Sequence, residues 1–468
     1  MQTECILDLF GFKPAAGRAV VAAFDGGHVT SDAGALLLAR TDAAIDLVGR
    51  LAACFDDARM PDLIEHSVRT MLMQRIFGIA LGWEDLLDHD TLRRDPVLAA
   101  CAGKLSARRA DCEALAGKST LNRLEHAREQ PGRYHRIGHD GAAIERLLVE
   151  LFLDAHAAPP EEIILDFDAT DDPLHGHQEG RFFHGYYDGY CYLPLYVFCG
   201  RHLLAAKLRP ANIDGAAGTV DELARIVLQI RARWPLVRIV LRGDSGFARD
   251  AIMTWCEQNR VDYLLGLARN ARLIGHIAAE LAEAAAESTQ TGKPARRFAA
   301  FGYATLKSWT QPRRVIAKAE QTGDKSNPRF VVTTLEGEAR HLYEEVYCAR
   351  GEMENRIKEC QLDLFADRTS AATMPARQLR LWFASMAYVL VDSLRRIGLA
   401  GTELARATCG TIRLRLLKIA ALVRISVRRV KVAMSSATLC QREWRDAYNA
   451  LGDAQKFLLQ GGALGAMV

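Results

Sequence analysis

Three acidic residues lie at positions where metal-dependent chemistry would place them. Asp168 ends a short apolar run, Asp244 closely follows a second one, and Glu354 lies in a stretch with helical spacing. Carboxylates that follow separate strands of an α/β sheet meet at one edge of that sheet, where a helix can add a third. Such a cluster suits two Mg²⁺ or Mn²⁺ ions, about 3.5–4 Å apart, that activate a water or a 3′-hydroxyl and stabilise the leaving oxygen of a phosphodiester.

Two aspartates compete for the first position of this cluster. Asp166 and Asp168 lie two residues apart, so they share one face of a strand. Asp168 is preferred because it precedes Ala169 and Thr170 at the strand end, and Asp166 is its first substitute. The sequence leaves this choice open.

The same segment admits a second enzyme class. Asp166-Phe-Asp168-Ala-Thr170 fits the Asp-x-Asp-x-Thr nucleophile motif of haloacid-dehalogenase-like phosphatases, with Asp244 as a later metal-binding acid. Those enzymes space a later acid pair as Asp-x3-Asp, whereas Asp244 and Asp250 are farther apart. The phosphatase is therefore the weaker interpretation.

The residues around Glu354 form a pattern of their own. Tyr347, Arg350 and Glu354 recur at i, i+3 and i+7, so a helix would bring them to one face, and Lys358 joins that face one turn later. Acids and bases at this spacing also form ordinary solvated ion pairs. That alternative does not explain why the chain also places Asp168 and Asp244 after apolar runs.

The sequence around these residues predicts an α/β core. Apolar, β-branched and aromatic runs predict consecutive strands, the 220–234 segment has the period of an amphipathic helix, and a buried strand follows it. The predicted strands span 162–168, 190–199, 202–208 and 237–241. Strands, a helix and another strand in this order predict an α/β core with a site at its strand ends.

An insertion interrupts this core between about residues 270 and 340. Ala-rich and then Thr-, Gly- and Lys-rich stretches break the pattern, and strand-like pieces follow at 314–319 and 330–334. A helix is expected to resume near Glu344 and to continue past Glu354. The catalytic core is therefore predicted over 159–370, with a β-rich insertion inside it.

Helical regions are predicted on both sides of the core. Residues 1–158 show helical spacing, and the 107–116 and 119–128 segments would allow a helix-turn-helix with Lys118 and Arg123 near the start of its second helix. An ordinary helical hairpin is the simpler interpretation. Residues 371–468 are expected to be largely helical and to form a basic patch, since they carry 15 Lys and Arg, Arg424 and Arg428 among them, against 5 Asp and Glu.

Composition excludes several classes of protein. Of the 468 residues, 49% are hydrophobic and 25% charged, which is typical of globular domains with substantial cores. The net charge of +3 favours no polyanionic partner by itself. The longest uncharged apolar stretches fall short of the ~20 residues that span a bilayer, so no membrane association is expected. The first twelve residues carry Glu4 and Asp8 and lack a basic segment before an apolar run, which favours a cytoplasmic protein without a signal peptide.

Three blocks of the chain together resemble the transposases of bacterial insertion sequences that use a DDE triad. The segment from Leu165 to Gly180, continued by the 185–190 segment, resembles their first catalytic block. Arg242-Gly-Asp244-Ser-Gly-Phe resembles the second block, and the 347–358 segment resembles the Tyr-Arg-Glu block. The blocks occur in the order that the family has, and weaker similarity extends over nearly the whole chain.

The resemblance implies a fold and a site. The fold would be an RNase H-like core with a β-rich insertion between the second and third acids. Asp168, Asp244 and Glu354 would be the metal ligands. Tyr347, Arg350 and Lys358 would contact phosphates near the cleaved end. The insertion's Trp309 would stack on a base or pack in the ordinary way. The chain departs from the family pattern at Gln361, where a lysine is usual, and this puts one phosphate contact and the hairpin chemistry in question.

The resemblance also implies an activity and partners. We expect a transposase that binds the terminal inverted repeats of its own element through its N-terminal and C-terminal regions, with Mg²⁺ or Mn²⁺ as cofactor. Cut-and-paste transposition would proceed by cleavage, a hairpin intermediate and strand transfer into target DNA. Cleavage of paired ends favours a homodimer, and action on DNA favours association with the bacterial nucleoid. A derivative that binds DNA but has lost catalysis is the remaining alternative.

Overall fold

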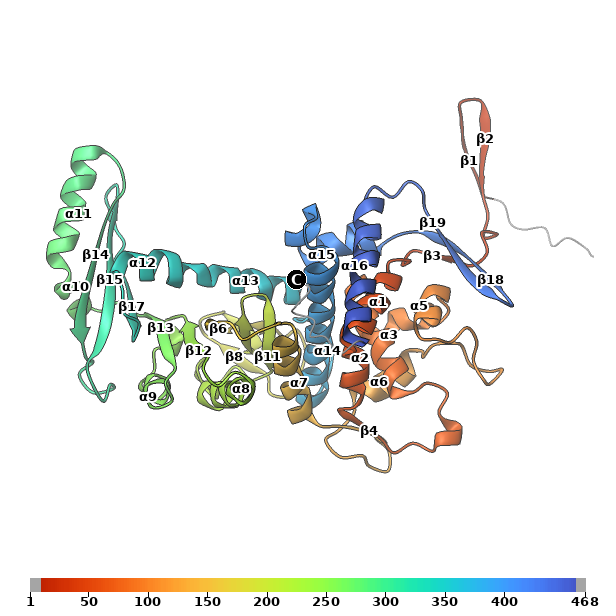
Figure 1. Ribbon diagram of the computed structural model, residues 1–468, viewed down its shortest axis with the longest axis horizontal. Helices are drawn as coiled ribbons and strands as arrows, with labels where there is room; N and C mark the ends of the chain where they lie inside the picture. The colour runs from red at the N-terminus through yellow and green to blue at the C-terminus, as the bar shows by residue number, and fades with distance from the viewer. Residues whose placement is uncertain (1–9, 460–468) are drawn as a thin grey trace, which may run out of the picture.

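The computed structural model describes residues 10–459 of the chain (Figure 1). Glu4 and Asp8, on which the expectation of a missing signal peptide depends, lie outside the described residues. In the part of the chain that the structure describes, no helix is both long and apolar enough to cross a membrane.

A large mixed sheet of nine strands forms the centre of the molecule. Its strands are, in spatial order, β11 (His202–Lys207), β10 (Leu195–Cys199), β6 (Glu162–Ala169), β12 (Arg238–Gly243), β13 (Asp262–Leu267), β17 (Arg329–Thr333), β15 (Arg313–Thr322) and β14 (Ala295–Tyr303), with β16 (Lys325–Ser326) paired to β15. β6, β12 and β13 run parallel, while β10, β11, β17, β15 and β14 join by antiparallel pairing. The carboxyl ends of β6 and β12 therefore lie side by side.

The predicted core strands are present, with one difference. The aromatic run at 190–199 contains two strands, because Leu193 and Pro194 interrupt it between β9 (Gly189–Tyr192) and β10. Proline lacks the N–H that a ladder requires, so a strand ends where it occurs. The predicted helix at 220–234 is α8 (Thr219–Arg233).

Alternation along the strands divides the sheet into two faces. On β6, Ile163, Leu165 and Phe167 point into a hydrophobic core that also contains α8 and α9 (Asp250–Gln258). Because successive side chains of a strand point to opposite faces, Asp166 and Asp168 lie on the other face. An irregular helix over residues 339–363 packs on that second face.

This irregular helix is the one predicted to resume near Glu344. It consists of α12 (Ala339–His341), a π-helical stretch at Leu342–Tyr347, a 3₁₀ turn at Cys348–Arg350, α13 (Gly351–Lys358) and a second π-helical stretch at Glu359–Asp363. It runs from the insertion towards the middle of the molecule (Figure 1). Single π-helical turns inside a helix shift the faces of the residues that follow them.

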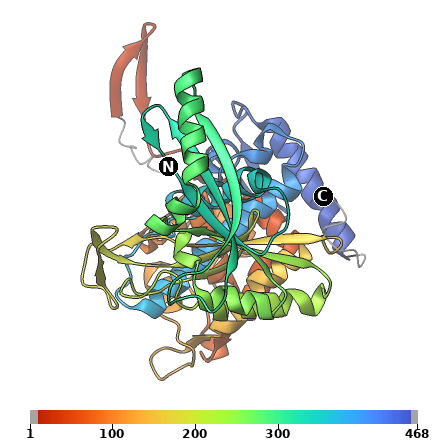
Figure 2. The same cartoon turned by 90° about the vertical axis from the view of Figure 1, so that its left-hand side faces the viewer.

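The insertion extends the central sheet and does not form a separate one. Two helices, α10 (Ala271–His276) and α11 (Ala278–Thr291), come first, and α11 packs against β14 and β15 (Figure 2). The predicted strands at 314–319 and 330–334 correspond to β15 and β17. Although β-rich, the insertion therefore also contains a helical layer.

The N-terminal and C-terminal regions share one hydrophobic core, in which α1 packs against α16 and α3 against α14. The helices of the two regions are α1 (Ala35–Ile45), α2 (Leu47–Ala52), α3 (Val68–Leu81), α4 (His89–Leu92), α5 (Pro96–Cys101), α6 (Lys118–Glu125), α7 (Gly141–Asp154), α14 (Met374–Ser393), α15 (Cys409–Ile412) and α16 (Gln441–Leu459). α7 contributes to this core and also to the core under the sheet. The described parts of the N-terminal and C-terminal regions thus fold together against the central sheet.

The helix-turn-helix and the simpler helical hairpin expected over 107–128 are both wrong. Residues 107–116 form turns and bends, and only the second segment is helical, as α6. In α6, the Lys118 side chain lies 3.3 Å from Asp90, and its backbone N–H also donates to Asp90. The segment 107–116 has four charged residues, and most of its apolar residues are alanines, so it has little apolar surface to bury as a helix.

Part of the C-terminal region, which was predicted to be largely helical, is a β-hairpin that carries two of the predicted basic residues. Arg424 lies on β18 (Ala421–Ser426) and Arg428 in the turn before β19 (Arg429–Met434). β3 (Val29–Thr30) pairs with β18, and a second hairpin, β1 (Phe10–Ala15) with β2 (Arg18–Ala22), projects away from the helices (Figure 1). β4 (Phe55–Asp57) pairs with β5 (Ile137–His139) in the N-terminal region. The alternating Val and Ile residues of 421–434 match a strand period, which charge counting overlooks.

Candidate active site

The first two acids lie next to each other at the carboxyl ends of two parallel strands. Gly243 of β12 pairs with Phe167 of β6, so one step farther along Asp244 comes opposite Asp168. Parallel strands lie about 4.8 Å apart, which brings these two carboxylates into one small region. Asp244 also begins a 3₁₀ turn, where its Oδ1 accepts from the N–H of Gly246 at 2.8 Å. The predicted convergence of these two strand ends is present.

The irregular helix brings Glu354 to the same region through Arg350. The Arg350 guanidinium donates to Glu354 Oε1 at 2.7 Å and lies 3.4 Å from Asp168 Oδ2. Arg350 and Asp168 are mostly buried, while about half of the Glu354 side chain is exposed. One cation therefore connects an acid of the sheet with the acid of the helix, and the predicted spacing of Arg350 and Glu354 produces a direct contact.

The surroundings of Asp168 disfavour its charged form. Burial, opposed by the Arg350 guanidinium and reinforced by the nearby carboxylates of Asp244 and Glu354, raises the pKa of its carboxyl to about 6. A carboxyl that is buried beside two others is more stable when a cation accompanies it. Arg350 supplies one positive charge for three acids, so the site retains an excess of negative charge.

Asp166, the alternative first ligand, has another role. Both of its carboxylate oxygens accept from Arg242, at 2.5 Å from Nε and 2.8 Å from Nη2, and both side chains are buried. Arg242 also donates to the backbone carbonyl of Val346 in the irregular helix. Asp166 thus fixes the helix to the sheet, which leaves it poorly suited to bind a metal or to act as the free nucleophile of the phosphatase interpretation.

Tyr347 is held against the second strand end. A Cβ built on Gly266 of β13 would lie 2.5 Å from the Tyr347 hydroxyl and 2.8 Å from the backbone nitrogen of Ser245, so only glycine fits there. Burial raises the pKa of Tyr347, and the Asp244 carboxylate raises it further. The tyrosine therefore remains a neutral hydroxyl beside Asp244.

A cavity of about 520 Å³ opens at this point of the site, and Asp244, Tyr347 and Gly266 line it. Arg269 and Arg329 also line the cavity, and both are exposed. Neither was predicted from the sequence. Arg269 follows β13, the parallel neighbour of β12, so its place after a third strand end was the available signal.

The remaining predicted site residues lie farther from the acids. Lys358 is exposed at the end of α13, one turn after Glu354. Trp309 of the insertion packs edge-on against Tyr303, with ring centroids 5.8 Å apart, and near the Arg313 guanidinium. Three other predicted DNA contacts, all exposed, lie on α6 and on the C-terminal hairpin: Arg123, Arg424 and Arg428.

Gln361, where the chain departs from the family pattern, contacts the segment at Asp171 and Asp172. Its amide nitrogen donates to the backbone carbonyl of Asp171 at 3.0 Å and lies 3.3 Å from Asp172 Oδ1. A longer, charged lysine would not make the same pair of contacts. Gln361 therefore orders the chain just beyond Asp168, and its own polar group is already engaged.

The donor set suits a hard divalent cation. Mg²⁺ and Mn²⁺ prefer oxygen ligands, and the three acids supply carboxylates with surplus negative charge. Among residues 10–459, no three acidic, histidine or cysteine side chains lie close enough together to hold a metal as they stand. The guanidinium of Arg350 pairs with two of the three acids, so it neutralises part of the negative charge that a bound metal ion would neutralise.

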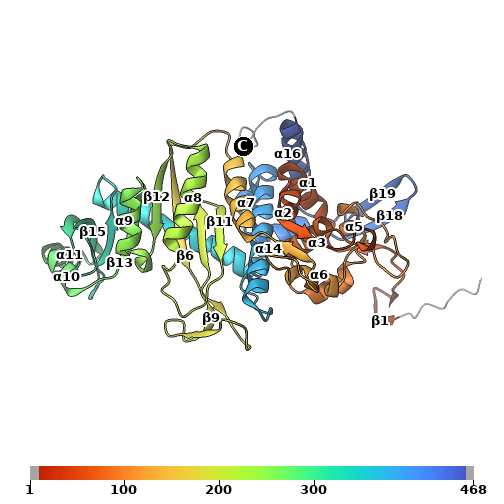
Figure 3. The ribbon, with the colours of Figure 1, turned by 90° about the horizontal axis from the view of Figure 1, so that it is seen from below.

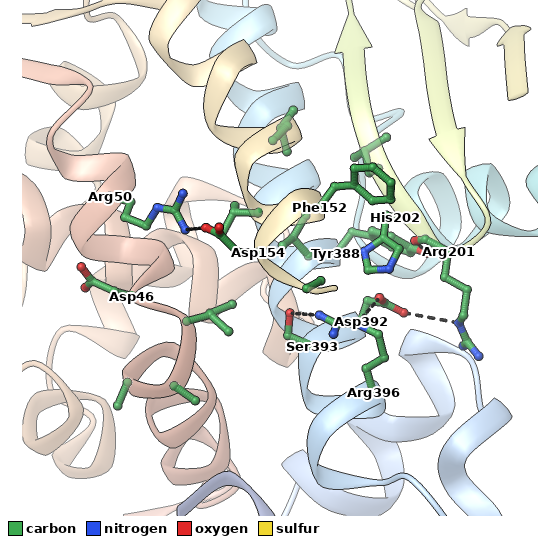
Figure 4. Close-up of a pocket in the computed structure, with 18 of the residues that line it drawn as sticks. Asp46, Arg50, Phe152, Asp154, Arg201, His202, Tyr388, Asp392, Ser393 and Arg396 are labelled. Atoms are coloured by element: carbon green, nitrogen blue, oxygen red, sulfur yellow. Dashed lines mark hydrogen bonds and ion pairs between the residues drawn. The ribbon is translucent and has the colours of Figure 1, made fainter. Parts of the chain in front are cut away.

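A second cavity lies away from this site. It has a volume of about 580 Å³ and lies between the N-terminal helices, α7 and α14 (Figure 4). Ion pairs line it: Arg50 lies 2.8 Å from Asp154, and Arg201 lies 3.4 Å from Asp392. None of the three acids contributes to its wall. This cavity therefore belongs to the junction between the terminal regions and the core.

A comparison with known families decides the identity of the chain. The model of the family described as transposase DDE domain group 1 matches residues 12–456, nearly the whole length. The chain belongs to this family of DDE transposases. It is accordingly an enzyme that binds DNA and catalyses DNA strand cleavage and strand transfer in transposition.

Comparisons with individual proteins add less about this DDE transposase. Among curated proteins none matches the chain. A solved structure described as the cryo-EM structure of the piggyBac transposase synaptic complex with hairpin DNA is similar at 10% identity and a TM-score of 0.40. That similarity covers 82% of this chain and 79% of the other. At this level we draw no functional conclusion from it.

Proposed function

We propose that this DDE transposase excises a bacterial insertion sequence, and that Asp168, Asp244 and Glu354 form the active site that cleaves the DNA. One observation carries the proposal: β6, β12 and α13 direct the three acids to one region, around the Arg350 guanidinium. In a chain of this family, three converging carboxylates are the expected catalytic group. We infer that the sheet around β6 and β12 is the RNase H-like core of the enzyme.

The proposed cofactor is a pair of Mg²⁺ or Mn²⁺ ions, in keeping with the general use of divalent metals by DDE transposases. When bound, the ions would activate the attacking water or 3′-hydroxyl and stabilise the leaving oxygen. Asp168, Asp244 and Glu354 would hold them. Arg350 would then be released from part of its pairing with the acids. Its planar guanidinium could bind a phosphate of the DNA with two hydrogen bonds.

Other residues of the site would orient the DNA. Tyr347 keeps a neutral hydroxyl beside Asp244, where it can donate to a phosphate oxygen. Exposed Lys358, Arg269 and Arg329 supply positive charge around the acids. These basic side chains would offset the electrostatic repulsion between the carboxylates and the phosphates of the DNA.

We further propose that the chain binds the terminal inverted repeats of its own element. Exposed arginines of the C-terminal hairpin, Arg424 and Arg428, would contact phosphates, and Lys118 and Arg123 of α6 would add to this surface. Cleavage of two ends in concert requires two active sites, so the active form would be a homodimer. Each freed 3′-hydroxyl would attack the opposite strand to form a hairpin, which is opened before strand transfer into target DNA.

Strand cleavage of DNA that spans the gene's own genomic flanks tests the proposed function. We expect the wild type with Mg²⁺ to produce specific nicks at an inverted repeat, and both Asp244→Ala and Glu354→Ala to abolish them while DNA binding remains. Glu352→Ala is the matched control, because Glu352 lies on the same helix with an exposed side chain and no contact to Arg350. Binding without cleavage by the wild type would instead identify a catalytically inactive derivative.

A further inference from the structure

A small three-stranded sheet stands apart from the central sheet, just beyond Asp168. We call residues 171–192 the aromatic flap. Its strands are β7 (Asp172–Pro173), β8 (Phe182–His184) and β9, in the order β7-β9-β8. The flap projects from the core, below the ends of the central strands in Figure 3. It is therefore a separate protrusion that begins where the active site does.

The base of the aromatic flap is firmly attached. Asp172 and Arg377 form an ion pair of 3.0 Å, and neither side chain is more than 1% exposed. Thr369 exchanges two hydrogen bonds with the flap: its hydroxyl donates to the carbonyl of Pro173 at 2.9 Å, and its own carbonyl accepts from Gln178 at 2.8 Å. Breaking such a buried pair is costly, so the position of the base relative to Asp168 is fixed.

The tip of the flap has the opposite character. Tyr186 is 85% exposed and Phe183 is 54% exposed, and Phe182 and Tyr190 are exposed beside them. Phe183 and Tyr190 contact edge to face, with ring centroids 5.6 Å apart, and the Arg181 guanidinium lies 3.7 Å from the centroid of the Tyr190 ring. Large aromatic rings gathered on a protrusion without a core to fill indicate a binding surface.

The flap is linked directly to the catalytic strand. The hydroxyl of Tyr187 donates to the carbonyl of Ala169 at 3.4 Å, one residue after Asp168. Tyr187 also packs on a small core formed by Cys191, Leu193 and Ala211. Tyr187 thus serves the structure of the flap, whereas its neighbour Tyr186 is left free at the surface.

We propose that the tip of the aromatic flap stacks on unpaired bases of the DNA strand that is cleaved at Asp168. Base faces stack on aromatic rings whatever the sequence, and an arginine beside the rings adds a cationic contact. Base pairs inside a duplex hide their faces, so this surface fits unpaired nucleotides and not duplex DNA. Arg181, which lies 3.2 Å from His177, would contact the phosphate backbone of that DNA strand. This inference rests on the proposed function, since it needs the cleaved strand at Asp168.

Binding of the full-length protein to fluorescein-labelled dT20 and to a 20-base-pair duplex tests the inference without requiring cleavage. We expect Tyr186→Ala and Phe183→Ala each to weaken dT20 binding about tenfold and to leave duplex binding within about twofold. Tyr186→Phe keeps the ring and should bind dT20 as the wild type does. Tyr134→Ala is the matched control, because Tyr134 is 84% exposed in the N-terminal region.

Several results would overturn the inference. One is a Tyr186→Ala variant that binds dT20 as tightly as the wild type, and another is equal loss of dT20 and duplex binding, which would indicate a surface for phosphates alone. Absence of dT20 binding by the wild type would also overturn it. A Tyr186→Ala variant whose mass in light scattering is half that of the wild type would show that the flap binds a second copy of the chain. Failure of the wild type to cleave flank DNA would count against the proposed function instead.

Discussion

At the scale of single residues, the site depends on Arg350, which compensates three acids with one charge. Arg350→Gln would leave Asp168 buried beside Asp244 and Glu354 without its cation, and should lower the free energy of unfolding by about 1–3 kcal/mol at pH 8. The folded-state pKa of Asp168, about 6, lies above its unfolded value, so this carboxyl loses its stabilising effect as the pH rises through 6. The defect should therefore shrink at pH 5, where Asp168 is protonated.

The effect of Mg²⁺ on thermal unfolding gives a second prediction for Arg350→Gln. A divalent cation should raise the thermal unfolding midpoint of Arg350→Gln more than that of the wild type, because the variant has more uncompensated charge to neutralise. Thermal unfolding in EDTA and in Mg²⁺ measures both effects. Arg356→Gln is a control on the same helix, since Arg356 pairs with Glu352 and Glu359 and not with the acids of the site. Equal Mg²⁺ shifts in Arg350→Gln and the wild type would contradict the account.

At the scale of elements, the site depends on the close approach of β13 to the irregular helix. Gly266→Ala would place a Cβ against the Tyr347 hydroxyl and the Ser245 backbone, so the helix or the Asp244 turn must shift. We expect a loss of about 1–3 kcal/mol in stability and at least a tenfold loss of cleavage rate, with DNA binding retained. Gly302→Ala is the control, because Gly302 also lies in a strand but has open space around it. Cleavage at the wild-type rate by Gly266→Ala would contradict this role.

The elements also show what local pattern can predict. The strands that carry Asp168 and Asp244 are buried on both faces, so continuous apolar runs identified them, and α8 showed its period because one face is solvated. The π-helical turns before Arg350 and the pairing of Asp166 with Arg242 could not be predicted, because both depend on contacts between distant segments. Charge obscured the strand period of the Arg424 hairpin, since both of its faces are largely exposed.

At the scale of the whole molecule, the ends of the chain fold as one unit. Leu38 of α1 and Leu390 of α14 are fully buried in the same core, 352 positions apart in the sequence. We expect Leu38→Ala and Leu390→Ala each to cost about 2–5 kcal/mol and to lower the midpoint of the same unfolding transition. Leu228→Ala is the control, because Leu228 of α8 is 75% exposed. Calorimetry that resolves two transitions, each shifted by only one variant, would contradict a shared core.

Exchange of one ligand atom tests the central claim that Asp244 binds the catalytic metal. Asp244→Cys replaces a carboxylate with a thiolate, which binds Mn²⁺ more readily than Mg²⁺ because Mg²⁺ strongly prefers oxygen. The cleavage assay on flank DNA, with either metal, is the measurement. We expect Asp244→Cys to cleave in Mn²⁺ but not in Mg²⁺, and Asp244→Ala to be inactive in both. Cleavage by Asp244→Ala in Mg²⁺ at the wild-type rate would contradict this claim.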